Sequence, residues 1–319
     1  MKIIVTGSCG FIGFHLSEKL LLEGYNVIGI DNYNSYIYNE SYKKLNSYLL
    51  KKYKNYIEIE DDILNDNYIL NNNPDIVIHL AAYANVRKSI ENPDMYIRNN
   101  VECTCKILKE ISKCKKTPLL IYASSSSVYG INKNVPFKET DSLDNIISPY
   151  ALSKKMCEEL VELFCKTNKI SAIGLRFFTV YGPGGRPDMA IFNFIKKIKF
   201  GEPITIYGDG SMQRDFTYVT DIVNGIYNCM FLNLNSGEHK LYNIGNNNPI
   251  SLIKLIEICE EVIEKKAIIM YDNIPTGDVP ITYANIDKAK NELKYIPSVN
   301  LLQGIKNMYS WFNNLNIKV

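Results

Sequence analysis

Three glycines near the start of the chain constrain its fold more than any other feature. Gly7, Gly10 and Gly13 follow the apolar run Lys2–Thr6, which is typical of a buried strand, and overlap the start of a leucine-rich helical pattern. Glycines in this context allow a tight turn, a close approach of the backbone to a pyrophosphate, and close packing of helix on strand. The N-terminus of such a helix offers N–H groups and a positive dipole end to phosphates. The motif therefore predicts a dinucleotide-binding unit.

A carboxylate follows at the position that such a unit requires. The next apolar run, residues 26–30, is closed by Asp31, eighteen residues after Gly13. An acid at the end of the second strand accepts hydrogen bonds from both ribose hydroxyls and repels a 2′-phosphate, which favours NAD over NADP. An ordinary glycine turn with a surface aspartate is the alternative, and the order of strand, glycines, helix, strand and acid disfavours it.

Apolar runs and helical patterns continue to alternate along the chain. The further expected strands lie near residues 57–59, 75–80, 119–123, 170–176 and 241–245, and the main expected helices near 95–113, 149–168 and 218–228. This alternation predicts an α/β fold: a Rossmann-type, doubly wound parallel sheet with a smaller C-terminal α/β substrate domain. After residue 178 the rhythm breaks into glycine- and proline-rich loops. We therefore expect a dinucleotide-binding domain over 1–178, with 216–246 returning to it, and a substrate domain over 179–215 and 247–319.

Composition excludes several other classes of protein. A net charge of +2 is too balanced for a nucleic-acid binder, and no apolar stretch is long enough to span a membrane, so we expect a soluble, cytoplasmic protein. Eight cysteines and three histidines lack metal-ligand spacing. We interpret the cysteines as reduced, mostly buried thiols and expect no metal site.

Tyr150 and Lys154 stand four residues apart at the start of a predicted helix, directly after Pro149. Residues at this spacing project from one helical face. A phenol titrates near pH ~10 in water, and an adjacent ammonium lowers its pKa, so the pair could supply a base near neutral pH. The spacing is also common at exposed helix starts, and only its combination with the nucleotide motif and the serine run 124–127 points to catalysis.

These motifs, and their order along the chain, resemble those of the extended short-chain dehydrogenase/reductase family of nucleotide-sugar enzymes. The matching segments span essentially the whole chain and include TGSCGFIG, IDN, VIHLAA, SSSSVYG, YALSK, LRFFTVYGP, RDFTYV and GDVPITYA. The resemblance implies a Rossmann domain that holds NAD tightly and a C-terminal domain that grips a UDP-sugar. By the resemblance, Tyr150 is the base, Lys154 orients the nicotinamide ribose, and Ser125 shares the proton of the sugar 4-hydroxyl.

The resemblance also implies two sets of binding residues. The cofactor set is Gly7, Gly10, Phe11, Ile12, Gly13, Asp31, Asn32, Asp62, Ile63, Ala81, Ala82, Asn100, Tyr150, Lys154 and Phe177. The substrate set is Arg87, Ser126, Ser127, Thr179, Arg186, Tyr207, Arg214 and Asp278. Within it, Arg214 is expected at the diphosphate and Asp278 at the uridine ribose, whereas Arg87 and Arg186 could equally be structural.

The serine run separates the reactions found in this family. Family members that remove water from the sugar, or carbon dioxide from UDP-glucuronate, resemble one another in carrying acids just before Val-Tyr-Gly. Here those positions are Ser126 and Ser127, which cannot act as general acid or base near neutral pH. We therefore expect reversible oxidation at C4 without elimination, which is the chemistry of a 4-epimerase.

Among the 4-epimerases, the segments YGPGGRPDMAIFNF, MQRDFTYVTDIV and VRKSIENP most resemble UDP-glucuronate 4-epimerases. Ser127, Thr179 and an arginine would bind the sugar carboxylate. Two positions depart from related patterns: Gly184 replaces a bulky residue, which predicts a looser loop, and Pro275 replaces the arginine of galactose epimerases.

Three alternatives remain at this stage. The chain could epimerise UDP-glucose or UDP-N-acetylglucosamine, it could be a decarboxylase or dehydratase, or it could be a silent NAD-binding scaffold on the same fold. The helical patterns near 95–113 and 149–168 carry apolar residues beyond one stripe, which predicts a homodimer contact or, alternatively, a core role.

Overall fold

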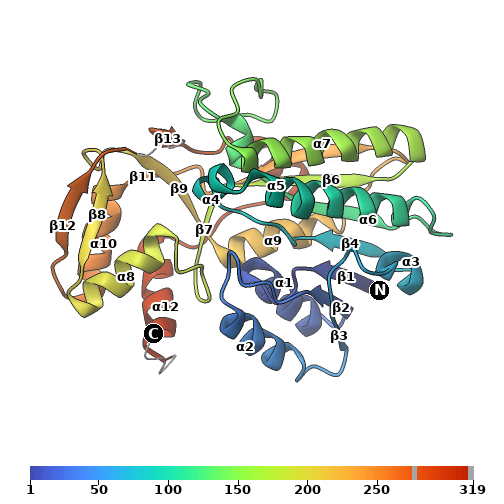
Figure 1. Ribbon diagram of the computed structural model, residues 1–319, viewed down its shortest axis with the longest axis horizontal. Coiled ribbons are helices and arrows are strands. Elements are labelled where there is room, and N and C mark those ends of the chain that lie inside the picture. The colour runs from blue at the N-terminus through green and yellow to red at the C-terminus, as the bar shows by residue number, and fades with distance from the viewer. Residues whose placement is uncertain (275–278, 315–319) are drawn as a thin grey trace.

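The computed structural model describes residues 1–274 and 279–314, and its largest element is a seven-stranded parallel sheet (Figure 1). The strand order is β10-β6-β5-β4-β1-β2-β3, so the chain winds outward from β1 first to one side and then to the other. The strands are β1 (Lys2–Thr6), β2 (Asn26–Asp31), β3 (Tyr56–Glu60), β4 (Ile76–His79), β5 (Leu119–Ser125), β6 (Ala172–Phe177) and β10 (His239–Ile244). This order places the turning point between β1 and β4, where doubly wound sheets bind their ligands.

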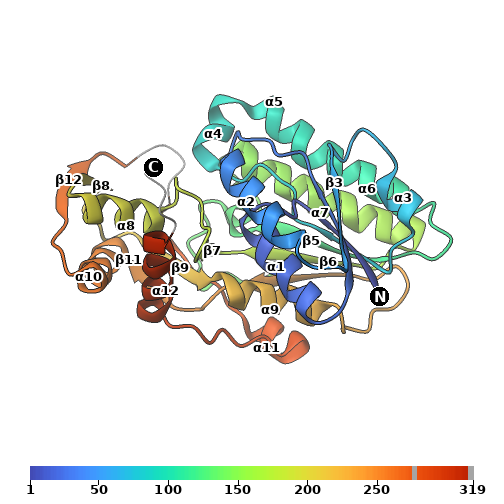
Figure 2. The same cartoon turned by 90° about the horizontal axis from the view of Figure 1, so that it is seen from below.

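Two hydrophobic cores lie on opposite faces of this sheet. Along β1, Ile3 and Val5 belong to one core and Ile4 to the other, because successive side chains of a strand point to opposite faces. Helices α1 (Phe11–Leu22), α2 (Glu40–Leu50) and α9 (Val219–Cys229) cover one face, and α3 (Tyr68–Asn72), α6 (Cys103–Ile111) and α7 (Pro149–Asn168) cover the other (Figures 1 and 2). The predicted doubly wound α/β class is confirmed.

The helix predicted near 95–113 is divided in the structure. Short helices α4 (Val86–Glu91) and α5 (Pro93–Tyr96) lead into η1 (Ile97–Glu102), a π-helical turn that passes into α6. Such a turn holds one extra residue, which a search for 3.6-residue periodicity does not reveal, and it frequently marks a functional site. The predicted helix over 149–168 is confirmed, with Pro149 in the first turn and the Ser148 hydroxyl accepting from the N–H of Ala151 at 3.1 Å.

Whereas α11 (Asp287–Leu293) packs against α9 and β10 of the main sheet, most of the remaining elements form a smaller part beside the carboxyl ends of the main strands (Figure 1). Its strands are β7 (Thr179–Tyr181), β9 (Gln213–Tyr218), β11 (Pro249–Ser251) and β13 (Ile281–Thr282) in one sheet, and β8 (Pro203–Tyr207) and β12 (Ile268–Asp272) in another. Its helices are α8 (Ala190–Phe200), α10 (Leu252–Ile263) and α12 (Leu301–Asn314). The chain returns to the main sheet through α9, which packs on α1, and β10, which pairs with β6, whereas β9 pairs with β7, β11 and β13.

Two further observations bear on the expected class of protein. No described helix is both long and apolar enough to cross a membrane. All eight cysteines are free thiols, six of them buried, and in the described residues no cluster of three or more potential ligands could hold a metal ion.

Candidate active site

A cavity of about 780 Å³ lies along the carboxyl ends of β1, β2, β4, β5 and β6 and extends to β7, β8 and α8. At one end its wall is the glycine turn after β1, and at the other it is formed by residues of the smaller part. A cavity at the point where the strand order reverses is where an open α/β sheet binds a nucleotide.

The glycine turn has the shape of a pyrophosphate cradle. Gly7 has a φ of +71°, and a Cβ there would lie 2.8 Å from the backbone nitrogen of Ala81. A Cβ on Gly13 would lie 2.0 Å from the carbonyl oxygen of Gly7, so only glycine lets α1 pack this closely on the turn. Gly10 caps α1 without a side-chain bond, which leaves the helix N–H groups directed at the cavity edge. The residues present therefore fit a dinucleotide.

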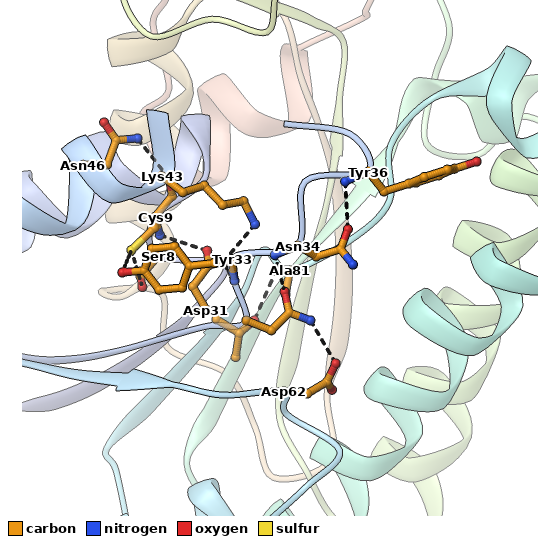
Figure 3. Close-up of polar contacts among 12 residues, drawn as sticks. Ser8, Cys9, Asp31, Tyr33, Asn34, Tyr36, Lys43, Asn46, Asp62 and Ala81 are labelled. Atoms are coloured by element: carbon orange, nitrogen blue, oxygen red, sulfur yellow. Dashed lines mark hydrogen bonds and ion pairs between the residues drawn. The ribbon is translucent and has the colours of Figure 1, made fainter. Parts of the chain in front are cut away.

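The expected ribose-binding acid lies at the end of β2, and it is paired (Figure 3). One carboxylate oxygen of Asp31 accepts from the N–H of Cys9 at 3.1 Å, and the other accepts from the ammonium of Lys43 at 2.9 Å. Asn32, next along the chain, donates to Asp62 at 2.9 Å and so ties the ends of β2 and β3 together. The cavity is bordered by all four of these residues, Asp31, Asn32, Lys43 and Asp62.

Tyr150, Ser125 and Lys154 meet at the middle of the cavity. Ser125 ends β5, and its hydroxyl accepts from the N–H of Ser127 at 3.2 Å and donates to the hydroxyl of Ser127 at 3.1 Å. The ammonium of Lys154 donates to the carbonyl oxygen of Ala123 at 2.8 Å. A hydroxyl and a phenol that line the same cavity can accept the proton of an alcohol bound between them, which is the proton-transfer part of reversible alcohol oxidation.

The electrostatics of Tyr150 differ from the sequence-based expectation. Burial raises the pKa of Tyr150, and the hydrogen bond from Ser125 and the positive charge of Arg186 act in the opposite direction. Burial also lowers the pKa of Lys154, whose ammonium is directed at Ala123. The pKa of Tyr150 is therefore raised in this structure, in contrast to the lowered pKa expected from a neighbouring ammonium.

The π-helical turn η1 supports the cavity from behind. Asn100 lies within it, is buried, and is not part of the cavity wall. Its side chain holds both backbone groups of Tyr83, at 2.8 and 3.0 Å, and donates to the hydroxyl of Ser153 at 2.9 Å. The backbone carbonyl oxygen of Asn100 accepts from the hydroxyl of Thr104 at 2.7 Å. Asn100 thus positions Tyr83 in the cavity wall, and its contact with the cofactor stays a prediction.

A buried ion pair braces the serine turn. The guanidinium of Arg176 on β6 forms two hydrogen bonds with the carboxylate of Glu158 on α7, at 2.9 and 2.8 Å. Glu158 also accepts from the hydroxyl of Ser124 at 2.5 Å, and Arg176 donates to the hydroxyl of Tyr129 at 2.9 Å. The two ends of the turn that carries Ser125 are therefore fixed to one salt bridge.

The end of the cavity next to the smaller part is lined by hydroxyls and cations. Ser127 and Thr179 border it together with Arg87, Arg186 and Arg214. The guanidinium of Arg87 lies 4.6 Å from the ring centroid of Tyr207, so a residue after β4 contacts the smaller part across the cavity. An excess of arginines suits a ligand that carries a diphosphate and a carboxylate.

Loop 182–188, between β7 and α8, is held against the main sheet by contacts that we call the latch. The hydroxyl of Tyr38 donates to the carbonyl oxygen of Gly184 at 2.7 Å, and Nε2 of His15 donates to that of Pro183 at 2.8 Å. Burial lowers the pKa of His15, so the neutral ring is the favoured form. The loop was expected to be looser because of Gly184, yet these bonds fasten it.

Arg186 and Asp188 complete the latch. The guanidinium binds both carboxylate oxygens of Asp188, at 3.0 and 2.5 Å, and donates to the carbonyl oxygen of Ala84. Asp188 in turn accepts from the side chain of Asn85 at 2.8 Å. Arg186 is therefore a partnered cation at the edge of the cavity, which combines the structural and the binding interpretations left open by the sequence.

The structure brings nearly all the expected residues to one cavity. Every expected cofactor-binding residue except Asn100 borders it, as does every expected substrate-binding residue except Asp278, which lies outside the described residues. Sequence reasoning missed Lys43, Tyr83, Asn85 and Asp188. The last of these stands within the GRPDM motif and was a visible candidate, whereas Lys43 is one of many lysines in a polar segment.

The fold and the cavity together define a nucleotide-dependent enzyme of the short-chain dehydrogenase/reductase type. A sequence model of the "NAD dependent epimerase/dehydratase family" matches residues 3–245. The chain belongs to this family.

Individual relatives match nearly the whole chain. It is 40% identical to Protein CapI of Staphylococcus aureus, covering 98% of each chain, and 39% identical to UDP-glucuronate 4-epimerase 1 of Arabidopsis thaliana, covering 98% of this chain and 76% of that protein. A solved structure of UDP-glucuronic acid 4-epimerase from Bacillus cereus, in complex with UDP-glucuronic acid and NAD, is similar with a TM-score of 0.92 and 35% identity, covering 99% and 100% of the two chains.

Proposed function

We propose that this chain inverts C4 of UDP-glucuronate to give UDP-galacturonate, with NAD as its cofactor. The observation that carries the proposal is the serine turn: Ser125, Ser126 and Ser127 border the cavity beside Tyr150, and the turn contains no carboxylic acid. The similarity to UDP-glucuronate 4-epimerases along the whole chain supports this substrate.

In the proposed reaction, Tyr150 is the base that removes the proton of the 4-hydroxyl, directly or through Ser125. NAD, when bound in the glycine cradle, supplies the hydride acceptor at C4 and later the donor. Lys154 orients the nicotinamide ribose from the adjacent turn of α7. The 4-keto sugar turns within the cavity, and Tyr150 returns the proton to the new C4 alcohol. Ser126 and Ser127 have no acid function with which to eliminate water.

A further demand follows from the substrate. Oxidation at C4 of a glucuronate gives a β-keto acid, which loses carbon dioxide when its carboxylate bond aligns with the carbonyl π system. We propose that Ser127, Thr179 and Arg186 bind the carboxylate and hold it out of that alignment. Arg186 is well placed because the latch fixes its guanidinium through Asp188.

The proposal is tested by incubating purified protein with UDP-glucuronate, UDP-glucose or UDP-N-acetylglucosamine and following the products by NMR. We expect UDP-galacturonate from the first and much slower turnover of the others. A pentose product would indicate a decarboxylase, and a keto-deoxy sugar a dehydratase. Tyr150→Phe should retain the dinucleotide and lose turnover, whereas a silent scaffold would show no turnover before the substitution.

The carboxylate contacts are tested by Ser127→Ala, Thr179→Ala and Arg186→Met. Each should divert part of the 4-keto intermediate to a UDP-pentose, which the unaltered protein should not release. Ser126→Ala, at the neighbouring position of the same turn, is the matched control. Clean epimerisation in all three variants would contradict the proposed holding role.

We also propose that the chain has the two domains expected from the sequence. The domain that binds NAD comprises residues 1–178 and 216–246. The domain that binds the UDP-sugar comprises residues 179–215 and 247–319. Arg214 would meet the diphosphate and Asp278 the uridine ribose. We further propose a cytoplasmic location, which the eight free thiols support.

A homodimer is proposed through the outer face of α6 and α7. Leu152 and Leu163 lie eleven residues apart on α7, about three turns, and are 45% and 54% exposed, while Ile97 on the adjoining η1 is 37% exposed. An exposed apolar row of this kind suits a self-complementary contact. Light scattering should give twice the chain mass, and Leu163→Glu should give the monomer; a monomeric unaltered protein would contradict the proposal.

A further inference from the structure

The carboxylate of Asp31 is held by three protein donors. One oxygen accepts from the N–H of Cys9 at 3.1 Å, and the other from the N–H of Tyr33 and the ammonium of Lys43, both at 2.9 Å (Figure 3). The carboxylate is 2% exposed and the lysine side chain 11% exposed. An ionised carboxylate offers about four lone-pair positions, so about one is left for a ribose hydroxyl.

Lys43 borders the same cavity as the glycine turn and Asp31. Figure 3 shows its side chain running from α2 down to the carboxylate at the end of β2. Among the residues that the structure describes, Asp31 is the only hydrogen-bond acceptor of this ammonium. A lysine ammonium carries three donors and is a common ligand of phosphate.

This pair changes the argument for NAD over NADP. A lone aspartate excludes NADP because its negative charge repels the 2′-phosphate. Asp31 together with Lys43 carries no net charge, so simple repulsion is weak here. A phosphate could attract Lys43, but only by separating it from Asp31, and a buried carboxylate left without its cation is strongly destabilised.

We propose that Lys43 is the cofactor-selecting partner of Asp31: the ion pair keeps the lysine occupied, and the lysine becomes a 2′-phosphate site when the aspartate is removed. Asp31 then has two functions: it accepts a hydrogen bond from a ribose hydroxyl, and it keeps the ammonium of Lys43 paired so that the ammonium does not bind a phosphate. This inference rests on the proposed use of a dinucleotide cofactor, and it adds the residue and the interaction that decide which dinucleotide is bound.

The test compares Asp31→Ser with the double variant Asp31→Ser/Lys43→Met. Each protein is freed of dinucleotide and titrated with NADH and NADPH, with binding followed by nicotinamide fluorescence. Asp31→Ser should raise the affinity for NADPH relative to NADH about 30-fold, the factor that one charge-assisted hydrogen bond of about 2 kcal/mol supplies. The double variant should lose this gain.

Lys44 provides the matched control, because it is the next residue on α2 and its side chain is 65% exposed and paired with Glu40. Asp31→Ser/Lys44→Met should select NADPH as well as Asp31→Ser does. Asp31→Asn, which preserves size and hydrogen bonding, repeats the comparison if the serine variant folds poorly. Equal NADPH selection with and without Lys43 would overturn the inference. Failure of the unaltered protein to bind either dinucleotide would instead refute the proposed function.

Discussion

Glu158→Gln is the substitution whose effect on the free energy of unfolding follows most directly from the structure. Glu158 and Arg176 form a two-pronged ion pair between α7 and β6, with side chains 5% and 2% exposed. The glutamine keeps the shape of the side chain and removes its charge, so Arg176 remains buried without an anion. Removing one partner of a buried pair costs about 3 to 5 kcal/mol of unfolding free energy.

The assay is thermal unfolding followed by circular dichroism. At roughly 2 °C per kcal/mol for a chain of this size, Tm should fall by about 6 to 10 °C. The matched control is Glu162→Gln, one turn further along α7, where the carboxylate is 51% exposed and pairs with Lys166. An exposed pair of this kind contributes at most about 0.5 kcal/mol.

Two further results show whether the loss of Tm in Glu158→Gln comes from the unpaired buried charge or from altered packing. Glu158→Gln/Arg176→Met removes both charges and should recover part of the lost Tm, because an apolar replacement of a whole pair is often neutral. The single variant should also lower kcat more than it changes KM, since Ser124, next to Ser125, donates to Glu158. A Tm loss equal to that of Glu162→Gln would refute the reasoning.

Three other predictions concern the base, the latch and the cradle. Arg186→Met should move the rising limb of the kcat/KM profile to higher pH, because its charge lowers the pKa of Tyr150, which must be ionised to act; an unchanged midpoint would contradict this. Tyr38→Phe removes one hydrogen bond of the latch, about 1 kcal/mol, and should speed dinucleotide release about fivefold in a fluorescence displacement assay, whereas an unchanged rate would show that the latch does not retain the cofactor. Gly13→Ala places a Cβ 2.0 Å from the carbonyl oxygen of Gly7, so we expect purified protein without nucleotide absorbance, and full occupancy would exclude the cradle.

Local patterns were sufficient to predict most of the fold. Buried strands such as β1 appear as short apolar runs, and α7 begins where Pro149 and Ser148 supply a first-turn proline and a cap. The π-helical turn η1 was missed because one inserted residue hardly changes helical periodicity. Its consequence, the inward position of Asn100, was therefore missed as well.

The sequence predicted most of the residues that line the cavity, but it did not predict which of their side chains contact one another. Lys43 and Asp31 stand twelve residues apart, Glu158 and Arg176 eighteen, and only the packing of helix on sheet joins each pair. The end point of the Lys154 side chain, whose ammonium donates to the carbonyl oxygen of Ala123, was also beyond prediction, since a spacing of four on a helix indicates only a shared face.

The latch has a consequence for how this protein is made. Loop 182–188 is drawn onto three separate segments of the sheet domain, from α1, from the stretch before α2 and from the turn after β4. Fastened in this way over one side of the cavity, it would hinder a large guest from entering the finished molecule. A dinucleotide that is acquired while the newly synthesised chain folds should therefore exchange only slowly afterwards, so its supply at that moment influences how many molecules start out with a bound cofactor.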